Sequence, residues 1–398
     1  MIIKPKFRGF ICTTAHPTGC EQYVKKQVEY AESRKLAVGP KNVLVIGSST
    51  GYGLASRIVS AFSGGAATIG VFYEKMASDN RTATAGWYNA AAFEKFANEK
   101  GYYAKSINGD AFSKEIKNQT IEMIKKDLGK IDLIVYSVAT SKRIDPATGI
   151  TYTSALKPIG NPYTSKTVNF HTGEVSQVTL EPANEEEIAH TVNVMGGDDW
   201  MLWIEALEKA DVLADGVITV AFSYIGPEMT HSVYREGTIG RAKDHLEATA
   251  LCLTKQLSKI NGRAYVSVNK ALVTQASSAI PVVPLYISLL YKVMKEKSNH
   301  EGCIEQISRL FSDRLYSGKI TVDEKERIRM DDWEMLPEIQ MEVEKLWNIV
   351  GTDNIENISD IAGYRREFFN LFGFECEGVN YNSDENEDVT IPSIDVVK

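Results

Sequence analysis

Tyr224, Tyr234 and Lys243 are residues whose types and spacing could carry out chemistry, and they follow one another within twenty positions. A phenol can donate a proton to a developing oxyanion, and a nearby ammonium lowers the pKa of that phenol. A lysine ammonium also binds ribose hydroxyls. A single tyrosine would carry little weight in a chain with 18 of them. Together the three predict a site that handles the proton accompanying a hydride transfer.

The interval between Tyr234 and Lys243 restricts how the backbone can bring the two side chains together. Residues i and i+4 share one face of a helix. Nine positions at about 100° each amount to about 900°, which is half a turn off that face. Gly237 and Gly240 lie between the two residues, so we expect Tyr234 in a loop and a helix beginning near 238–240. The apolar stripe of that helix would be Ile239, Ala242, Leu246, Ala250 and Leu253.

A glycine-rich turn, Gly47-Ser-Ser-Thr-Gly51-Tyr-Gly53, follows a short apolar strand, Val43–Ile46. An amphipathic helix is expected from about Gly51, and a second strand over Ala67–Phe72. Glycines let a pyrophosphate approach the backbone, and a helix N-terminus offers free N–H groups. The spacing G-x-x-x-G-x-G is typical of the short-chain reductase branch of Rossmann proteins. We therefore predict dinucleotide binding, with a tight turn that binds nothing as the alternative.

Polar or small residues follow the next strands of the predicted sheet. Glu74 lies 23 positions after Gly51, where an acid accepts hydrogen bonds from the adenosine ribose and repels a 2′-phosphate. This favours NADH over NADPH, although Glu74 could also be a surface residue. Asp110 follows the third strand, 102–107, and is expected either at the adenine edge or as the cap of a helix over 112–128. Val138–Ala139, after the fourth strand, would approach the nicotinamide ribose.

The remaining parts of the chain are expected to surround this core. We predict a Rossmann core over 41–295, preceded by an N-terminal arm, 1–40, and interrupted by an insertion, 140–215, with a small β-hairpin over the active-site mouth. The fifth strand, 217–224, ends at Tyr224. The sixth, 264–268, leads into a loop that closes over the nicotinamide and then into a run of apolar residues, 280–290. That run could be an acyl-chain wall or a plain core helix.

The C-terminal extension, 296–398, is predicted to be helical, and the whole chain to be one large domain. Its helices are expected at 304–317, 335–350 and 358–372. The acids of Asp331-Asp332-Trp333-Glu334 are expected to begin the second helix and complement its dipole, with no catalytic role. The polar stretch 382–388 is expected to be a solvated, mobile end.

Composition limits the possible partners and locations. The chain has 398 residues, 43% of them apolar, and a net charge of −8, which disfavours nucleic acid as a partner. Five scattered cysteines fit reduced thiols in the cytoplasm. Cys12, His16 and Cys20 match no zinc pattern, so no metal is expected. No signal peptide is expected, because residues 1–10 are mixed and basic, and the apolar run 279–294 is expected to be too short and too interrupted to span a membrane.

Four stretches together resemble the trans-2-enoyl-CoA reductases of the FabV-type enoyl reductase family. They are Gly47–Gly53, Tyr224–Glu228, the pair Tyr234-x8-Lys243, and Val268–Thr274. The similarity extends over essentially the whole chain and is close to the clostridial crotonyl-CoA reductases. It implies NADH-dependent reduction of the C2=C3 double bond of an enoyl thioester, carried by CoA or acyl carrier protein, in fatty acid or butyrate metabolism. A monomeric enzyme is expected.

The resemblance also implies roles for individual residues. Tyr234 would be the proton donor, Tyr224 would bind the thioester carbonyl region, and Lys243 would hold NADH. Two other functions stay open: a short-chain ketone or alcohol dehydrogenase, which the long Tyr–Lys interval disfavours, and a non-catalytic NADH-binding regulator. The implied cofactor site comprises Gly47, Ser48, Ser49, Thr50, Gly51, Tyr52, Tyr73, Glu74, Asp110, Ala111, Val138, Ala139, Lys243, Leu272, Val273 and Thr274.

Overall fold

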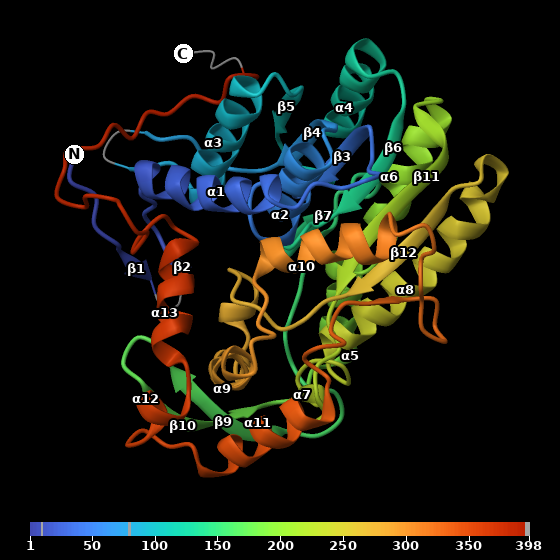
Figure 1. The fold of residues 1–398 in the computed structure, drawn as a ribbon. Coiled ribbons are helices and arrows are strands. Elements are labelled where there is room, and N and C mark those ends of the chain that lie inside the picture. Colours follow the sequence, from blue (N-terminus) through green and yellow to red (C-terminus); the bar gives the residue numbers. More distant parts are fainter. Residues whose placement is uncertain (9–10, 79–80, 395–398) are drawn as a thin grey trace.

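Seven parallel strands form the central sheet among the residues that this computed structural model describes, which are 1–8, 11–78 and 81–394 (Figure 1). Their order is β13-β12-β11-β6-β3-β4-β5, so the chain adds strands first on one side of β3 and then on the other. This confirms the predicted Rossmann-type α/β sheet. The bounds are β3 Asn42–Ile46, β4 Ala67–Phe72, β5 Ala104–Asn108, β6 Ile131–Tyr136, β11 Leu213–Ser223, β12 Arg263–Val268 and β13 Ile328–Arg329.

Helices cover both faces of the sheet because side chains alternate along its buried strands. Val43 and Val45 of β3 pack on one face, against α1, α2, α3 and α10, while Leu44 and Ile46 pack on the other, against α4, α6 and α8. The helices of the first face are α1 Pro17–Glu32, α2 Gly51–Ile58, α3 Ala85–Glu99 and α10 Cys303–Arg309. Those of the second face are α4 Lys114–Asp127, α6 Asp198–Lys209 and α8 Thr238–Leu257.

A third apolar cluster lies beyond the sheet, around α9 Val283–Glu296. In Figure 1, α9 is seen end-on above the hairpin of β9 and β10, with α13 beside it. The helices α11 and α13 and the strand β9 pack against it. Most of this apolar run forms a buried helix, and Tyr224 and Tyr234 pack against the cluster to which it belongs. The surrounding elements are β9 Tyr163–Asn169, β10 Glu174–Leu180, α11 Pro337–Ile349, α12 Ile355–Ile358 and α13 Ile361–Asn370.

The insertion holds two hairpins, where one was predicted. The first pairs β7 Lys142–Ile144 with β8 Thr151–Thr153, and the second pairs β9 with β10. The helix α5 Glu185–Met195 follows them. At the N-terminus, β1 Phe7–Arg8 pairs with β2 Ile11–Cys12, and the His16 side chain caps α1 by accepting a hydrogen bond from the Gly19 N–H at 3.1 Å.

Two predictions for the C-terminal extension are wrong. The helix α11 begins at Pro337, so Asp331 and Glu334 precede it and do not complement its dipole. The polar stretch 382–388 is bound to the body of the protein: the Tyr88 hydroxyl donates to the Glu387 carbonyl at 2.8 Å, and the Thr18 hydroxyl donates to the Glu385 carboxylate at 2.6 Å. These contacts hold the tail against α3 and α1.

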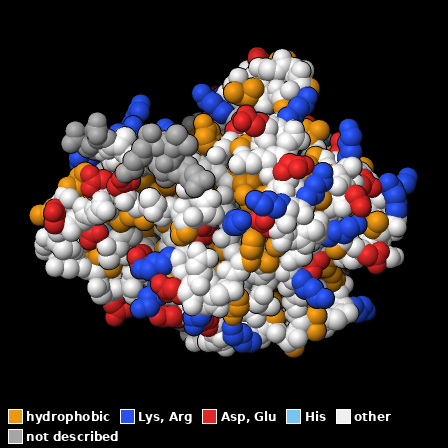
Figure 2. All heavy atoms as spheres, turned by 90° about the horizontal axis from the view of Figure 1, so that it is seen from above, with side chains coloured by type: hydrophobic (Ala, Val, Ile, Leu, Met, Phe, Trp, Pro, Cys, Tyr) orange, Lys and Arg blue, Asp and Glu red, His pale blue; other side chains and the backbone are white. Residues whose placement is uncertain are grey.

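Charged side chains of both signs lie on the surface of the protein. On the face shown in Figure 2, basic and acidic side chains are interspersed. In the described part of the chain no helix is both long and apolar enough to cross a membrane.

Cys252 on α8 is exposed, whereas burial raises the pKa of the other four thiols, Cys12, Cys20, Cys303 and Cys376.

Candidate active site

The glycine-rich turn meets the end of β6 at the point where the strand order reverses. Gly47 has φ of +86°, and a Cβ atom there would overlap the Ser137 carbonyl. A Cβ at Gly53 would in turn overlap the Gly47 carbonyl. Only glycine fits these two positions, because backbone atoms occupy the space of a side chain. The carboxyl ends of β3 and β6 therefore form the crevice in which open α/β sheets bind their ligands.

A cavity of about 480 Å³ lies over this crevice. It collects residues that follow four different strands, as the sequence predicted. The predicted cofactor residues that line it are Gly47, Ser49, Thr50, Tyr73, Glu74, Asp110, Ala111, Val138 and Ala139. The hairpin of β7 and β8 contributes Lys142, Ile144 and Thr151 to the same cavity.

Glu74 is held in a fixed orientation at the end of β4. The Ser49 hydroxyl donates to its carboxylate at 2.6 Å, and its backbone N–H donates to the Asn108 side chain at 2.8 Å. Burial raises the pKa of Glu74. The carboxylate is thus positioned to accept hydrogen bonds inside the cavity, while the adjacent Tyr73 side chain is 77% exposed.

Asp110 belongs to the cavity and does not cap the following helix. Its carboxylate accepts the Phe112 N–H at 3.0 Å, whereas Ser113 caps α4 by accepting the Ile116 N–H at 3.1 Å. Lys117 reaches back from α4 and donates to the Ala111 carbonyl at 2.8 Å. The turn beneath the cavity is therefore fixed by hydrogen bonds from both sides.

Other predicted cofactor residues do not line this cavity. Ser48 is 1% exposed and donates to the Val71 carbonyl, and the Tyr52 hydroxyl donates to the Lys270 carbonyl at 2.9 Å. Leu272 and Val273 line a second cavity of about 380 Å³ beside α1 and α10. The methyl group of Thr274 lies near Gly51, at 4.0 Å from where a Cβ would stand.

Tyr224 and Tyr234 come into contact at the end of β11. Their ring centroids are 4.8 Å apart with the planes at 84°, and burial raises the pKa of both phenols. Tyr234 lies in the turn between α7 Glu228–His231 and α8, as predicted from the two glycines. A Cβ at Gly240 would overlap the Arg235 carbonyl, so glycine allows the turn to fold onto the first turn of the helix.

Lys243 reaches the end of the same strand from the beginning of α8. Its ammonium donates to the Phe222 carbonyl at 3.0 Å, two residues before Tyr224. Burial lowers its pKa to about 8. The predicted stripe of α8 is buried along its whole length, which fixes the rotation of the helix. Lys243 and the two phenols are thus positioned by neighbouring ends of β11 and α8.

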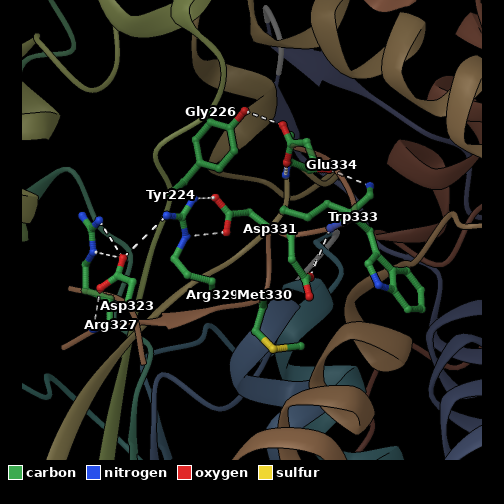
Figure 3. A network of polar contacts seen from close by, with 12 residues as sticks. Tyr224, Gly226, Asp323, Arg327, Arg329, Met330, Asp331, Trp333 and Glu334 are labelled. Carbon is green, nitrogen blue, oxygen red and sulfur yellow. Dashed lines mark hydrogen bonds and ion pairs between the residues drawn. The ribbon is translucent and has the colours of Figure 1, made fainter. Parts of the chain in front are cut away.

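Glu334 is a residue of this site that the sequence interpretation missed. Its side chain is fully buried, and the Tyr224 hydroxyl donates to Oε1 at 3.0 Å (Figure 3). The Tyr286 hydroxyl donates to the same oxygen at 2.7 Å, and the Ala271 N–H donates to Oε2 at 2.7 Å. Burial raises the pKa of Glu334. No local pattern distinguishes this acid from its neighbours in the sequence.

Family models match three consecutive parts of the chain. Residues 81–316 match the model described as trans-2-enoyl-CoA reductase catalytic region. Residues 2–79 match the NAD(P)H binding domain of trans-2-enoyl-CoA reductase, and residues 322–384 match a model described as enoyl reductase FAD binding domain. The catalytic-region model thus contains Tyr234 and Lys243, while the glycine-rich turn lies in the second model.

Full-length relatives are similar over the same extent. A trans-2-enoyl-CoA reductase (NADH) of Ruminiclostridium cellulolyticum is 63% identical over 394 residues, covering 99% of this chain and 100% of the relative. An enoyl-acyl-carrier-protein reductase (NADH) of Flavobacterium johnsoniae is also 63% identical, with coverage of 99% and 100%.

Solved structures share the fold. The trans-2-enoyl-CoA reductase of Treponema denticola in complex with NAD has a TM-score of 0.94 at 54% identity, covering 98% of both chains. That of Clostridium acetobutulicum in complex with NADH has a TM-score of 0.96 at 46% identity, covering 99% of this chain and 100% of the other.

Proposed function

Because the chain belongs to the trans-2-enoyl-CoA reductase family, we propose that it uses NADH to reduce the C2=C3 double bond of a trans-2-enoyl thioester. The observation that carries this proposal is the contact between Tyr224 and Tyr234 at the end of β11, where the Lys243 ammonium also donates to the Phe222 carbonyl. Two phenols in one buried place suit a reaction that puts negative charge on an oxygen and then needs a proton.

The cavity over β3 and β6 fits a dinucleotide. Gly47 and Gly53 have no side chain that would cover the backbone, and the N-terminus of α2 lies at the same crevice. Glu74 would accept the ribose hydroxyls and disfavour a 2′-phosphate, which supports NADH over NADPH. Lys243 would bind the nicotinamide ribose, and the loop of Leu272–Thr274 would cover that end. Bound NADH supplies a hydride to C3 of the substrate.

The chain's own residues would then handle the charge and the proton. Hydride addition at C3 moves negative charge onto the thioester oxygen, and a hydrogen bond from Tyr224 would stabilise that oxygen. Tyr234 would deliver the proton to C2. Burial raises the pKa of both phenols, so each is in its protonated, donating form at neutral pH.

The carrier of the acyl group is expected to be CoA or acyl carrier protein, since both occur in the names of the relatives. Lys142 lies on the hairpin at the edge of the cavity, where it could meet a phosphate of either carrier. A crotonyl-like substrate, a cytoplasmic location, a place in lipid metabolism and a monomeric state form part of the same proposal.

The described residues of 322–384 do not fit a flavin dinucleotide. Its pyrophosphate is anionic and needs free N–H groups or basic side chains. Arg327, Arg329 and Arg365 of this segment are each already paired with a carboxylate. No residue of this segment lines the cavity over β3 and β6. We therefore assign no step to a flavin.

A turnover assay with NADH and crotonyl-CoA, followed by nicotinamide absorbance, tests the proposal. We expect oxidation of NADH coupled to formation of butyryl-CoA. Turnover of acetoacetyl-CoA in place of crotonyl-CoA would favour a ketone reductase. Binding of NADH without turnover of either thioester would favour a non-catalytic regulator.

A further inference from the structure

Glu334 connects the substrate-binding tyrosine to the loop after β12. It lies in the segment between β13 and α11, and Figure 3 shows its carboxylate facing the Tyr224 hydroxyl. One of its oxygens accepts hydrogen bonds from Tyr224 and Tyr286, and the other accepts the Ala271 N–H. The acid thus touches a phenol expected to bind substrate and also the backbone expected to cover the nicotinamide.

A phenol has one hydrogen to donate. When Glu334 is charged, the hydrogen of Tyr224 is directed to Oε1, and Tyr224 presents only lone pairs to the space beside Tyr234. An oxygen in that state cannot stabilise a thioester oxygen that is gaining negative charge.

Protonation of Glu334 reverses this arrangement. The added hydrogen must reside on Oε1, because Oε2 faces the Ala271 N–H, which has nothing to accept it with. Two phenol oxygens adjoin Oε1. That of Tyr286 already accepts a hydrogen bond from Gln340 at 3.1 Å, which leaves the Tyr224 oxygen as the freer acceptor. Once Tyr224 accepts from Glu334, its own hydrogen no longer points to the carboxylate.

Building on the function proposed above, we propose that Glu334 is a positioning residue that sets the direction of the Tyr224 hydroxyl hydrogen. Protonated Glu334 releases that hydrogen toward the thioester oxygen, and charged Glu334 retains it.

The groups around Glu334 set the pH range of this switch. Tyr224 and Tyr286 are neutral, because burial raises the pKa of each. Burial is the largest cause that raises the pKa of Glu334. Asp331, on the same segment, also raises it and is itself paired with Arg329 at 2.7 Å. Lys270, whose own pKa burial lowers to about 8, acts in the opposite direction. Turnover is therefore expected to fall as the pH rises through the pKa of Glu334.

Glu334→Gln would keep the protonated arrangement at every pH. The Ala271 N–H selects the orientation of the amide, since only the amide oxygen can accept it. The amide NH₂ then faces Tyr224 and Tyr286, and donates to both. We expect kcat of E334Q to lose the decline on the alkaline side. Above the pKa of Glu334, E334Q should exceed the native enzyme by about tenfold for each pH unit.

The experiment measures kcat against pH at saturating NADH and crotonyl-CoA, with folding followed by thermal unfolding and by NADH binding. Tyr286→Phe is the matched control, because it removes the other phenol from Oε1 and should keep the alkaline decline. In a Tyr224→Phe background, E334Q should no longer change the profile. A decline that persists in E334Q, or an effect of E334Q that persists without Tyr224, would overturn the proposal; the second result would point to Lys270.

A second measurement leaves Glu334 in place. The ratio of native to Tyr224→Phe turnover should fall toward one as the pH rises, because charged Glu334 already withholds the hydrogen that the variant lacks. A ratio that does not change with pH would overturn the inference even if E334Q does not fold. Absence of NADH oxidation by the native enzyme at every pH would instead refute the proposed function.

Discussion

The two halves of the proposed site are built in different ways. The cofactor half consists largely of backbone: Gly47 and Gly53 are required because main-chain atoms press on each other after β3 and β6. The substrate half consists of side chains, and Tyr224 and Glu334 are brought together across 110 positions of the sequence. Adding an atom to a glycine should therefore impair the cofactor half, and removing an atom from a side chain should impair the substrate half.

Tyr234→Phe should have the largest effect, because it removes one oxygen from the substrate half. We expect turnover to fall on the order of a hundredfold or more, since loss of one such donor costs about 3–4 kcal/mol in the transition state. The affinity for NADH should be nearly unchanged. Steady-state kinetics and NADH titration measure the two. Tyr265→Phe, on β12 with its side chain in the core, is the control. Native turnover in Tyr234→Phe would remove this residue from the mechanism.

Gly47→Ala should damage the cofactor half by adding one carbon. The new Cβ would overlap the Ser137 carbonyl, at a φ of +86° that alanine adopts poorly. We expect about tenfold or greater loss of NADH affinity and roughly 1–3 kcal/mol loss of stability. Gly65→Ala isolates backbone strain, because Gly65 has φ of +70° and no atom within 4 Å of a Cβ. Equal NADH affinities in the two variants would contradict the role of close backbone contact.

Glu74→Ala tests the side chain on which the cofactor half depends for selectivity. Removal of the carboxylate should narrow the preference for NADH over NADPH by about tenfold, or about 1.4 kcal/mol. The measurement is the ratio of kcat/KM for the two coenzymes. Ser49→Ala, which removes only the hydroxyl bound to Glu74, should change the ratio less. An unchanged ratio in Glu74→Ala would end the proposed role of this acid.

Raising the pH should have the smallest effect of the four changes, and the quantity it changes is the affinity for NADH. It acts on Lys243, which lies where the two halves meet. Lys243 has a pKa lowered to about 8 by burial, so its ammonium is present below that pH and is lost above it. NADH affinity of the substrate-free enzyme should therefore fall several-fold between about pH 7 and pH 9. Lys243→Arg stays charged and should flatten this dependence. A native affinity that does not vary with pH would exclude a ribose contact that needs the charged lysine.

The same contrast explains what could be predicted from the sequence. The bounds predicted for β4 agree with the structure, and α8 begins where Gly237 and Gly240 indicated. These features depend on residues within a few positions of each other, so periodicity and glycine placement were sufficient.

The failures share one physical cause, which is dependence on distant partners. Glu334 sits among other acids, and its partners Tyr224 and Tyr286 precede it by 110 and 48 positions. The acidic tail was expected to be mobile, yet Trp87 and Tyr88 donate to its backbone carbonyls. Because every residue carries a carbonyl, such acceptors leave no signature in the side-chain sequence.

The exposure of one thiol has a practical consequence. Cys252 is exposed on α8, about 13 Å along the helix from Lys243 at roughly 1.5 Å per residue. Burial keeps the other four cysteines in their unreactive protonated form. A maleimide dye would therefore attach first to Cys252 in the native chain, which allows labelling at one position without any introduced cysteine.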